Sequence, residues 1–213
     1  TKYLSLHDNL TGLYNRAYFE TEMSRLSSFR FIPVGIIMCD VDGLKLVNDI
    51  LGHSTGDSLL KETADVIRKC FRDSDVVARL GGDEFAVLLP KTPISVIEKI
   101  CKRVQHATER YNAENPAIPL SISMGFAVKD EISKGMSELF READGNMYTQ
   151  KLHQKQHARQ AIVQRLMKTL EERDIATYSH VELLQKLVTA MAYKMGLPEQ
   201  CIRDMSLLAK FHN

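Results

Sequence analysis

The chain has 213 residues, of which 44% are apolar and 26% charged, a composition typical of globular proteins with a buried core. Only 11 Gly and 6 Pro are present, which excludes collagen-like and disordered classes. The 28 Lys and Arg residues nearly balance the 27 Asp and Glu residues, so no broad basic field would attract nucleic acid or an anionic membrane. Any anionic ligand must therefore be held locally.

In chain order, the apolar periodicity predicts helices alternating with strands up to about residue 153. The expected helices cover residues 17–29, 57–71, 94–104 and 136–153. The expected strands cover residues 31–39, 76–80, 85–89 and 120–128. The second and third strands flank Gly81–Glu84 and read as a hairpin with an acidic tip. This order predicts an α+β fold, with one mainly antiparallel sheet and helices packed on it.

From residue 157 onward every periodic segment is helical, which predicts a change of domain. The helices are expected over residues 162–173, 181–195 and 199–211, with a break at 174–177. We therefore divide the chain into a first domain, residues 1–156, and an all-helical unit, residues 157–213, that is too short to be complete.

The cellular setting is inferred from apolar runs and cysteines. The longest apolar run, residues 34–39, is far too short to span a bilayer, and no signal segment opens the chain. The four cysteines show no CxxC pair and no metal-ligand spacing, which favours reduced thiols and a cytoplasmic location. The chain starts without Met, so we expect a piece of a longer protein that could carry a membrane anchor elsewhere.

Carboxylates cluster at two predicted turns. Asp40 and Asp42 follow the first strand, and Asp83 and Glu84 lie at the hairpin. If the strands are neighbours these groups converge, and converging carboxylates repel one another unless a hard cation neutralises them. Mg²⁺ fits, since it takes few protein oxygens and completes its shell with water and substrate phosphates. Solvated turn acids are the simpler alternative, but the second acidic turn and Lys45 nearby favour the metal site.

Four segments resemble the GGDEF family of diguanylate cyclases. They are residues 8–16 (DNLTGLYNR), 40–57 (DVDGLKLVNDILGHSTGD), 79–85 (RLGGDEF) and 143–151 (ADGNMYTQK), within a similarity that spans about 7–155. The resemblance implies a palm-like nucleotidyl cyclase fold with a ferredoxin-like core. It also implies that two GTP condense into cyclic di-GMP with loss of pyrophosphate, in bacterial second-messenger signalling. A homodimer would bring the two GTP together, with Mg²⁺ or Mn²⁺, two per active site, and without nucleic acid or membrane contact.

The resemblance also implies roles for individual residues. Asp40, Asp83 and the backbone carbonyl of Val41 would bind metal. Asp83 is the expected base near the attacking ribose 3′-OH, Glu84 supports it, and Lys45 would stabilise charge at the α-phosphate.

Base recognition follows from the donors and acceptors of guanine. Guanine N1–H and the N2 amino group are donors that a carboxylate accepts in bidentate fashion, whereas adenine N1 is an acceptor. The resemblance places Asn48 and Asp57 at the guanine, with His53 near the same edge, so Asp57 favours GTP over ATP. The alternatives are that Asp57 is a helix N-cap and that His53 is structural.

Four further residues complete the implied sites. Lys151 and Lys155 would balance the triphosphate, although Gln154 replaces a usual glycine and each lysine alone would read as a surface residue. Arg72 and Asp75 match the family's inhibitory product site, which cyclic di-GMP would occupy. An RxxD pair is otherwise typical of a charged helix end, and the extra arginine that usually completes the site is not placed.

The C-terminal part loosely resembles the start of an HD-type metal-dependent phosphohydrolase. The similar segments are residues 178–180, 195–198 and 211–213. The expected terminal His-Asp reads His212-Asn213, and further ligands are absent, so His180 and His212 are treated as structural and no hydrolysis is expected. The alternative function is a catalytically weak GGDEF module that binds GTP or cyclic dinucleotide and regulates a fused HD-type phosphodiesterase.

Overall fold

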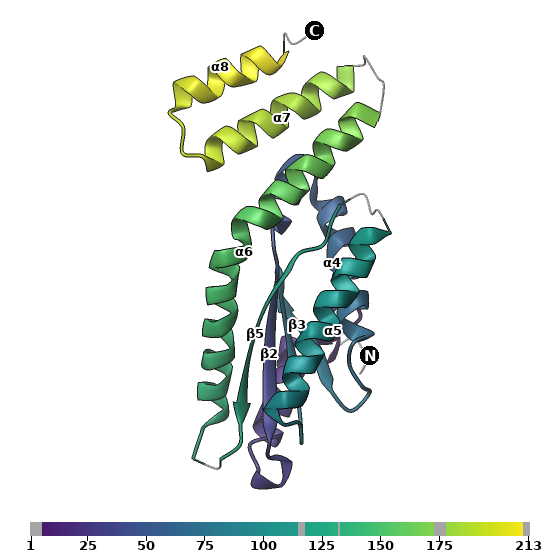
Figure 1. The fold of residues 1–213 in the computed structure, drawn as a ribbon, viewed down its shortest axis with the longest axis vertical. Helices are drawn as coiled ribbons and strands as arrows, with labels where there is room; N and C mark the ends of the chain where they lie inside the picture. Colours follow the sequence, from purple (N-terminus) through teal and green to yellow (C-terminus); the bar gives the residue numbers. More distant parts are fainter. Residues whose placement is uncertain (1–5, 115–117, 132, 173–177, 211–213) are drawn as a thin grey trace.

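A computed structural model describes residues 6–114, 118–131, 133–172 and 178–210, without the side chains of 154–159, 166–172, 178–183, 207, 208 and 210 (Figure 1). The strands are β1 (Tyr14–Asn15), β2 (Val34–Val41), β3 (Val76–Gly81), β4 (Glu84–Leu89) and β5 (Ile122–Lys129). The helices are α2 (Arg16–Arg25), α3 (Leu44–Leu51), α4 (His53–Arg68), α5 (Ile94–Ala113), α6 (Met136–Glu172), α7 (Tyr178–Lys194) and α8 (Glu199–Lys210), with a 3-10 turn at Phe29–Phe31.

The strands form one sheet in the order β1-β3-β4-β2-β5. β2 pairs antiparallel with β4 and with β5, β3 and β4 form the expected hairpin, and β1 joins β3 in parallel. All eight residues of β2 are buried, because helices cover both faces of the sheet (Figure 1). The prediction of an α+β fold with a mainly antiparallel sheet and flanking helices is thus confirmed.

Side chains of β2 alternate between two apolar clusters, as the two-residue period of a strand requires. Ile37 and Cys39 belong to a cluster that includes residues of α3, α4 and α5. Ile36 and Met38 belong to a cluster on the other face, which includes residues of α2 and α6. The core therefore holds β2 rigidly from both sides and fixes the position of its last residues.

Several boundaries differ from the prediction. β2 runs to Val41 and not to Cys39, because backbone pairing with β4 and β5 continues through the acidic residue at its end. The two-residue β1 and the eight-residue α3 were not predicted. α4 begins at His53 after Gly52, so Asp57 lies inside the helix, and its interpretation as an N-cap is wrong.

The C-terminal helices continue from the sheet domain without a break at residue 156. α6 runs from Met136 to Glu172, so the predicted helices 136–153 and 162–173 are parts of one continuous helix. α7 and α8 pack on each other, and α7 contacts α3 at the end of the sheet where β2 ends and β5 begins (Figure 1). The predicted break at 174–177 lies outside the described residues. Within the described part of the chain, no helix is long and apolar enough to cross a membrane.

Candidate functional site

The two acidic segments meet at one end of β2. Antiparallel pairing of β2 with β4 sets Asp40 opposite Glu84. The backbone N–H of Val41 donates to the carbonyl oxygen of Asp83 at 3.0 Å, which joins the strand end to the hairpin turn. Because β4 begins at the hairpin turn and β2 is its neighbour, the carboxylate of Asp40 at the end of β2 lies beside the turn that carries Asp83.

Asp40 is the most strongly perturbed carboxyl group of this site. Only 4% of the residue is exposed, and Lys151 Nζ of α6 lies 2.6 Å from its Oδ1. Burial raises the pKa of Asp40 to about 6, and the charges of Asp83 and Asp42 add to this rise, while Lys151 opposes it. Although burial lowers the pKa of Lys151, the hydrogen bond from its ammonium group to Asp40 raises it above its ordinary value. The ion pair thus offsets part of the repulsion among the carboxylates.

Asp42 is held by hydroxyl groups. Its two carboxylate oxygens accept hydrogen bonds from Ser121 Oγ at 2.7 Å and from Ser123 Oγ at 2.8 Å. Asp42 is also buried, and its charge adds to the negative potential at Asp40. The serines at the start of β5 therefore anchor the segment that leads from β2 into α3.

Arginines clamp the hairpin, a feature that the sequence analysis missed. The Arg79 guanidinium donates to the Gly82 carbonyl at 2.8 Å and pairs with Asp8 at 3.1 Å. Arg16 Nε donates to the Leu80 carbonyl at 3.0 Å, and its Nη2 lies 3.7 Å from Glu84. Except for the bond from Arg79 to Gly82, these contacts join residues far apart in sequence, so no local pattern reveals them. They fix the turn that carries Asp83.

The residues at this end of β2 fit a hard divalent cation in character. Asp40, Asp83 and the Val41 carbonyl offer oxygen ligands, and mutual repulsion of the carboxylates is what a cation would relieve. Among the described residues, no three His, Cys, Asp or Glu side chains form a metal-binding cluster. A divalent cation held by few protein oxygens completes its shell with water or substrate phosphates.

The predicted base-recognition residues lie on α3 and α4. Asn48 is half-buried, and its Oδ1 is buried without a hydrogen-bond partner. A Cβ on Gly56 would overlap this oxygen, so the glycine of α4 leaves the room that the Asn48 side chain occupies. His53 and Asp57 are exposed on α4. The oxygen of the Asn48 amide thus points toward Gly56 of α4, although the residue as a whole is partly exposed.

The remaining predicted residues fall in three places. Lys45 is exposed on α3, and Lys155 is in α6 with its side chain outside the described residues. Asp75 is buried, and its carboxylate accepts from the Arg72 backbone N–H at 3.0 Å in a tight turn. Arg72 and Asp75 line a separate cavity of about 290 Å³, to which Arg68 at the end of α4 also contributes. The sequence analysis had given Arg68 no role.

Fold and site together define the class: an α+β domain that carries converging carboxylates and a lysine at the end of a central strand. A family profile described as "Diguanylate cyclase, GGDEF domain" matches residues 5–157. The chain therefore belongs to the GGDEF family.

Known relatives agree with this assignment. The chain is 35% identical over 156 residues to the probable diguanylate cyclase DgcT of Escherichia coli, covering 71% of this chain and 34% of the relative. It is 36% identical over 153 residues to the diguanylate cyclase TpbB of Pseudomonas aeruginosa, covering 68% and 35%. The chain thus spans about a third of these curated relatives.

Solved structures show the same fold. The GGDEF domain of DgcB from Caulobacter crescentus, in complex with c-di-GMP, superposes with a TM-score of 0.64 at 25% identity, covering 70% of this chain and 91% of that one. The GGDEF domain of TpbB from Pseudomonas aeruginosa gives a TM-score of 0.60 at 34% identity, covering 69% and 89%.

Proposed function

We propose that this chain is a bacterial, cytoplasmic diguanylate cyclase that condenses two GTP into cyclic di-GMP and releases two pyrophosphates. The observation that carries the proposal is the meeting of Asp40 at the end of β2 with Asp83 at the hairpin, where Lys151 pairs with Asp40. A buried carboxylate whose pKa is raised by burial and by neighbouring acids is costly to keep, so a site that retains Asp40 indicates chemistry with a cationic or phosphate-bearing ligand.

The acidic residues would organise the attacking group. Asp40, Asp83 and the Val41 carbonyl would hold Mg²⁺ or Mn²⁺, with two ions per active site. The bound metal would lower the pKa of the ribose 3′-OH and screen the negative charge of the phosphates. The Asp83 carboxylate oxygen that does not bind metal would accept the proton of the ribose 3′-OH. Glu84 supports that position, because Arg16 and the pairing with Asp40 fix it. The attack on the α-phosphate then displaces pyrophosphate in line.

The basic residues would bind and orient the triphosphate. Lys45, which is exposed on α3, would stabilise charge that develops at the α-phosphate. Lys151 would turn from Asp40 to a phosphate oxygen when substrate binds, and Lys155 would add charge one helical turn further along α6. Such contacts hold the reacting atoms in line, which is most of what a protein contributes to phosphoryl transfer.

Guanine specificity would come from α3 and α4. The exposed carboxylate of Asp57 would accept hydrogen bonds from guanine N1–H and N2, and the half-buried amide of Asn48, which can donate and accept, would bind the same base. His53, at the start of α4, would lie at the same edge. ATP would leave the Asp57 carboxylate facing the N1 acceptor of adenine, an unpaired contact that costs affinity.

Assembly and regulation extend this proposal. Product formation requires two bound GTP, so two protomers would face each other in a homodimer. Cyclic di-GMP would bind back at Arg72 and Asp75, and Arg68 in the same cavity would supply the additional cation. Residues 1–156 would form the cyclase domain, and residues 157–213 the first part of an HD-type helical domain.

The experiment is incubation of the protein with GTP and Mg²⁺, with ATP in parallel, followed by chromatography of the nucleotides. We expect cyclic di-GMP and pyrophosphate from GTP alone. Asp83→Ala is expected to abolish turnover while the circular dichroism spectrum stays unchanged. Unchanged GTP at a protein concentration where sedimentation shows a dimer would refute the cyclase assignment, and a product that contains adenine would refute the role of Asp57.

A further inference from the structure

A large pocket lies between α3 of the sheet domain and the C-terminal helices α7 and α8. Its volume is about 740 Å³, within the range of small-ligand sites. Lys45 and Asp49 of α3 form one wall. The other walls come from α7 and α8, through Gln185, Lys186, Thr189, Ala190, Tyr193, Lys194 and Ser206.

Apolar contacts hold α6 and α7 against the segment that follows β2. Ile162 of α6 is 1% exposed, and its Cδ1 lies 2.5 Å from the position that a Cβ on Gly43 would take. Leu187 of α7 is 3% exposed and joins the same core cluster as Val41 and Leu44. The pocket therefore has an outer wall fixed by burial of apolar surface, directly beside the start of α3.

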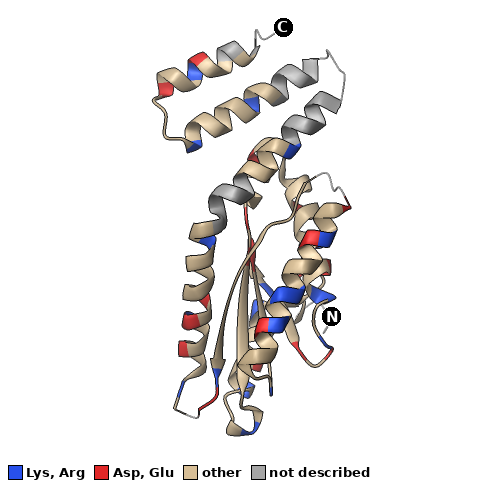
Figure 2. Cartoon of the chain, in the orientation of Figure 1, with Lys and Arg blue, Asp and Glu red and all other residues tan. Residues whose placement is uncertain are grey.

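The pocket suits an anion. Three lysines, Lys45, Lys186 and Lys194, line it against one carboxylate, that of Asp49. Tyr193 and Ser206 also line it, whereas the Thr189 hydroxyl donates to the Gln185 carbonyl within α7 at 2.7 Å. The described side chains of α7, residues 184–194, include these two lysines and no acidic residue, although charges of both signs occur along the other helices (Figure 2). Lysine ammonium groups from opposite walls of one cavity are typical of phosphate-binding sites.

We propose that this pocket receives the distal phosphates of the bound nucleoside triphosphate, and that Lys186 of α7 binds them. This inference rests on the proposed function, since Lys45 is shared between the pocket and the triphosphate site proposed above. The C-terminal helices thereby become part of the substrate site, because α7 lies across the pocket from α3. Substrate affinity and the docking of α7 on α3 are then linked, since each favours the other.

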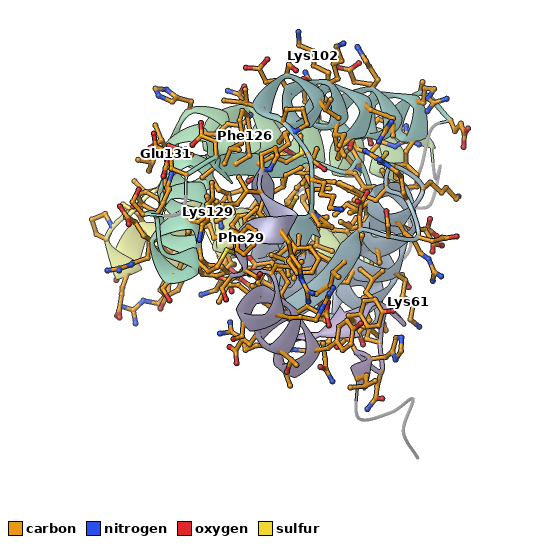
Figure 3. The ribbon with its side chains drawn as sticks, turned by 90° about the horizontal axis from the view of Figure 1, so that it is seen from below. Phe29, Lys61, Lys102, Phe126, Lys129 and Glu131 are labelled. Atoms are coloured by element: carbon orange, nitrogen blue, oxygen red, sulfur yellow. The ribbon has the colours of Figure 1, made fainter. Side chains whose placement is uncertain are left out.

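The test measures binding by calorimetry in the presence of Mg²⁺, with the full chain. The probes are a GTP analogue with an α,β-methylene bridge, which cannot lose pyrophosphate, and GMP, which lacks the distal phosphates. Lys186→Gln is compared with wild type and with Lys102→Gln, a matched change on α5 that removes an exposed lysine outside the pocket (Figure 3).

We expect Lys186→Gln to weaken the triphosphate analogue roughly two- to fivefold, the size typical of a solvent-accessible ion pair, and to leave GMP affinity unchanged. The effect should shrink at high salt. If wild type binds the analogue but Lys186→Gln binds it equally well or more tightly, or loses the same affinity for GMP, the inference is overturned. The triphosphate site itself is then still supported by the binding to wild type. If wild type binds neither nucleotide, the proposed function fails as well.

Discussion

Replacement of Asp40 by Asn tests whether the site is kept at the expense of stability. Asp40 is 4% exposed, and its pKa is about 6 in the folded protein against an ordinary value of 3.8. Each pKa unit corresponds to about 1.36 kcal/mol, so ionised Asp40 destabilises the folded state by about 3 kcal/mol. Asn has nearly the same shape without the charge. Asp40→Asn is therefore expected to raise the free energy of unfolding by up to about 3 kcal/mol at pH 8.

The sign of the pH dependence follows from the direction of the shift. A folded pKa above the unfolded one means that the folded state binds the proton more tightly, so wild-type stability falls as the pH rises from about 4 to about 6. The advantage of Asp40→Asn should accordingly grow over this window and stay constant above it. Below pH 4 wild type and variant should be equally stable, because Asp40 is then protonated in both the folded and the unfolded state.

The assay is urea unfolding of both proteins with a chelator, at pH 4 and at pH 8, followed by circular dichroism. For a chain of this size the expected gain corresponds to roughly 6–12 °C in Tm. Asp65→Asn, at an exposed position of α4, is the control and should change the free energy of unfolding by less than about 0.5 kcal/mol. A loss of stability at pH 8, or an equal gain at both pH values, would refute the reasoning.

Two further predictions concern packing and the hairpin clamp. Gly125→Ala would place a Cβ into the backbone of α6 at Ala143 and Met147, so we expect a loss of about 3 kcal/mol in urea unfolding, whereas Gly145→Ala, which meets no atom, should gain about 0.5–1 kcal/mol. Arg79→Gln should lower the free energy of unfolding by about 1–3 kcal/mol and cut turnover of GTP, because the hairpin loses its contacts to Asp8 and the Gly82 carbonyl. Retention of full activity by that variant would contradict the role of the clamp.

The apolar pattern was sufficient to predict the existence and type of an element where that element is long and amphipathic. It failed for α3, which has eight residues between Gly43 and Gly52 and so offers little more than two turns of periodicity. It also ended β2 too early, since an Asp is rare in strands and only pairing with Glu84 and Ser123 keeps Asp40 in the sheet. The apolar pattern also divided α6 into two helices at residues 154–161, although no Gly or Pro interrupts residues 146–172 to end it.

The sequence by itself determined the α+β class, the hairpin with its acidic turn, and the family, because these depend on local periodicity and on motifs written in consecutive residues. Only the tertiary structure decided which groups act on one another: that Lys151 pairs with Asp40, that Arg79 reaches Asp8, and that Lys186 faces the wall formed by Lys45. The physical reason is that charge interactions depend on distance and burial, and both are set by how strands and helices distant in the chain pack together.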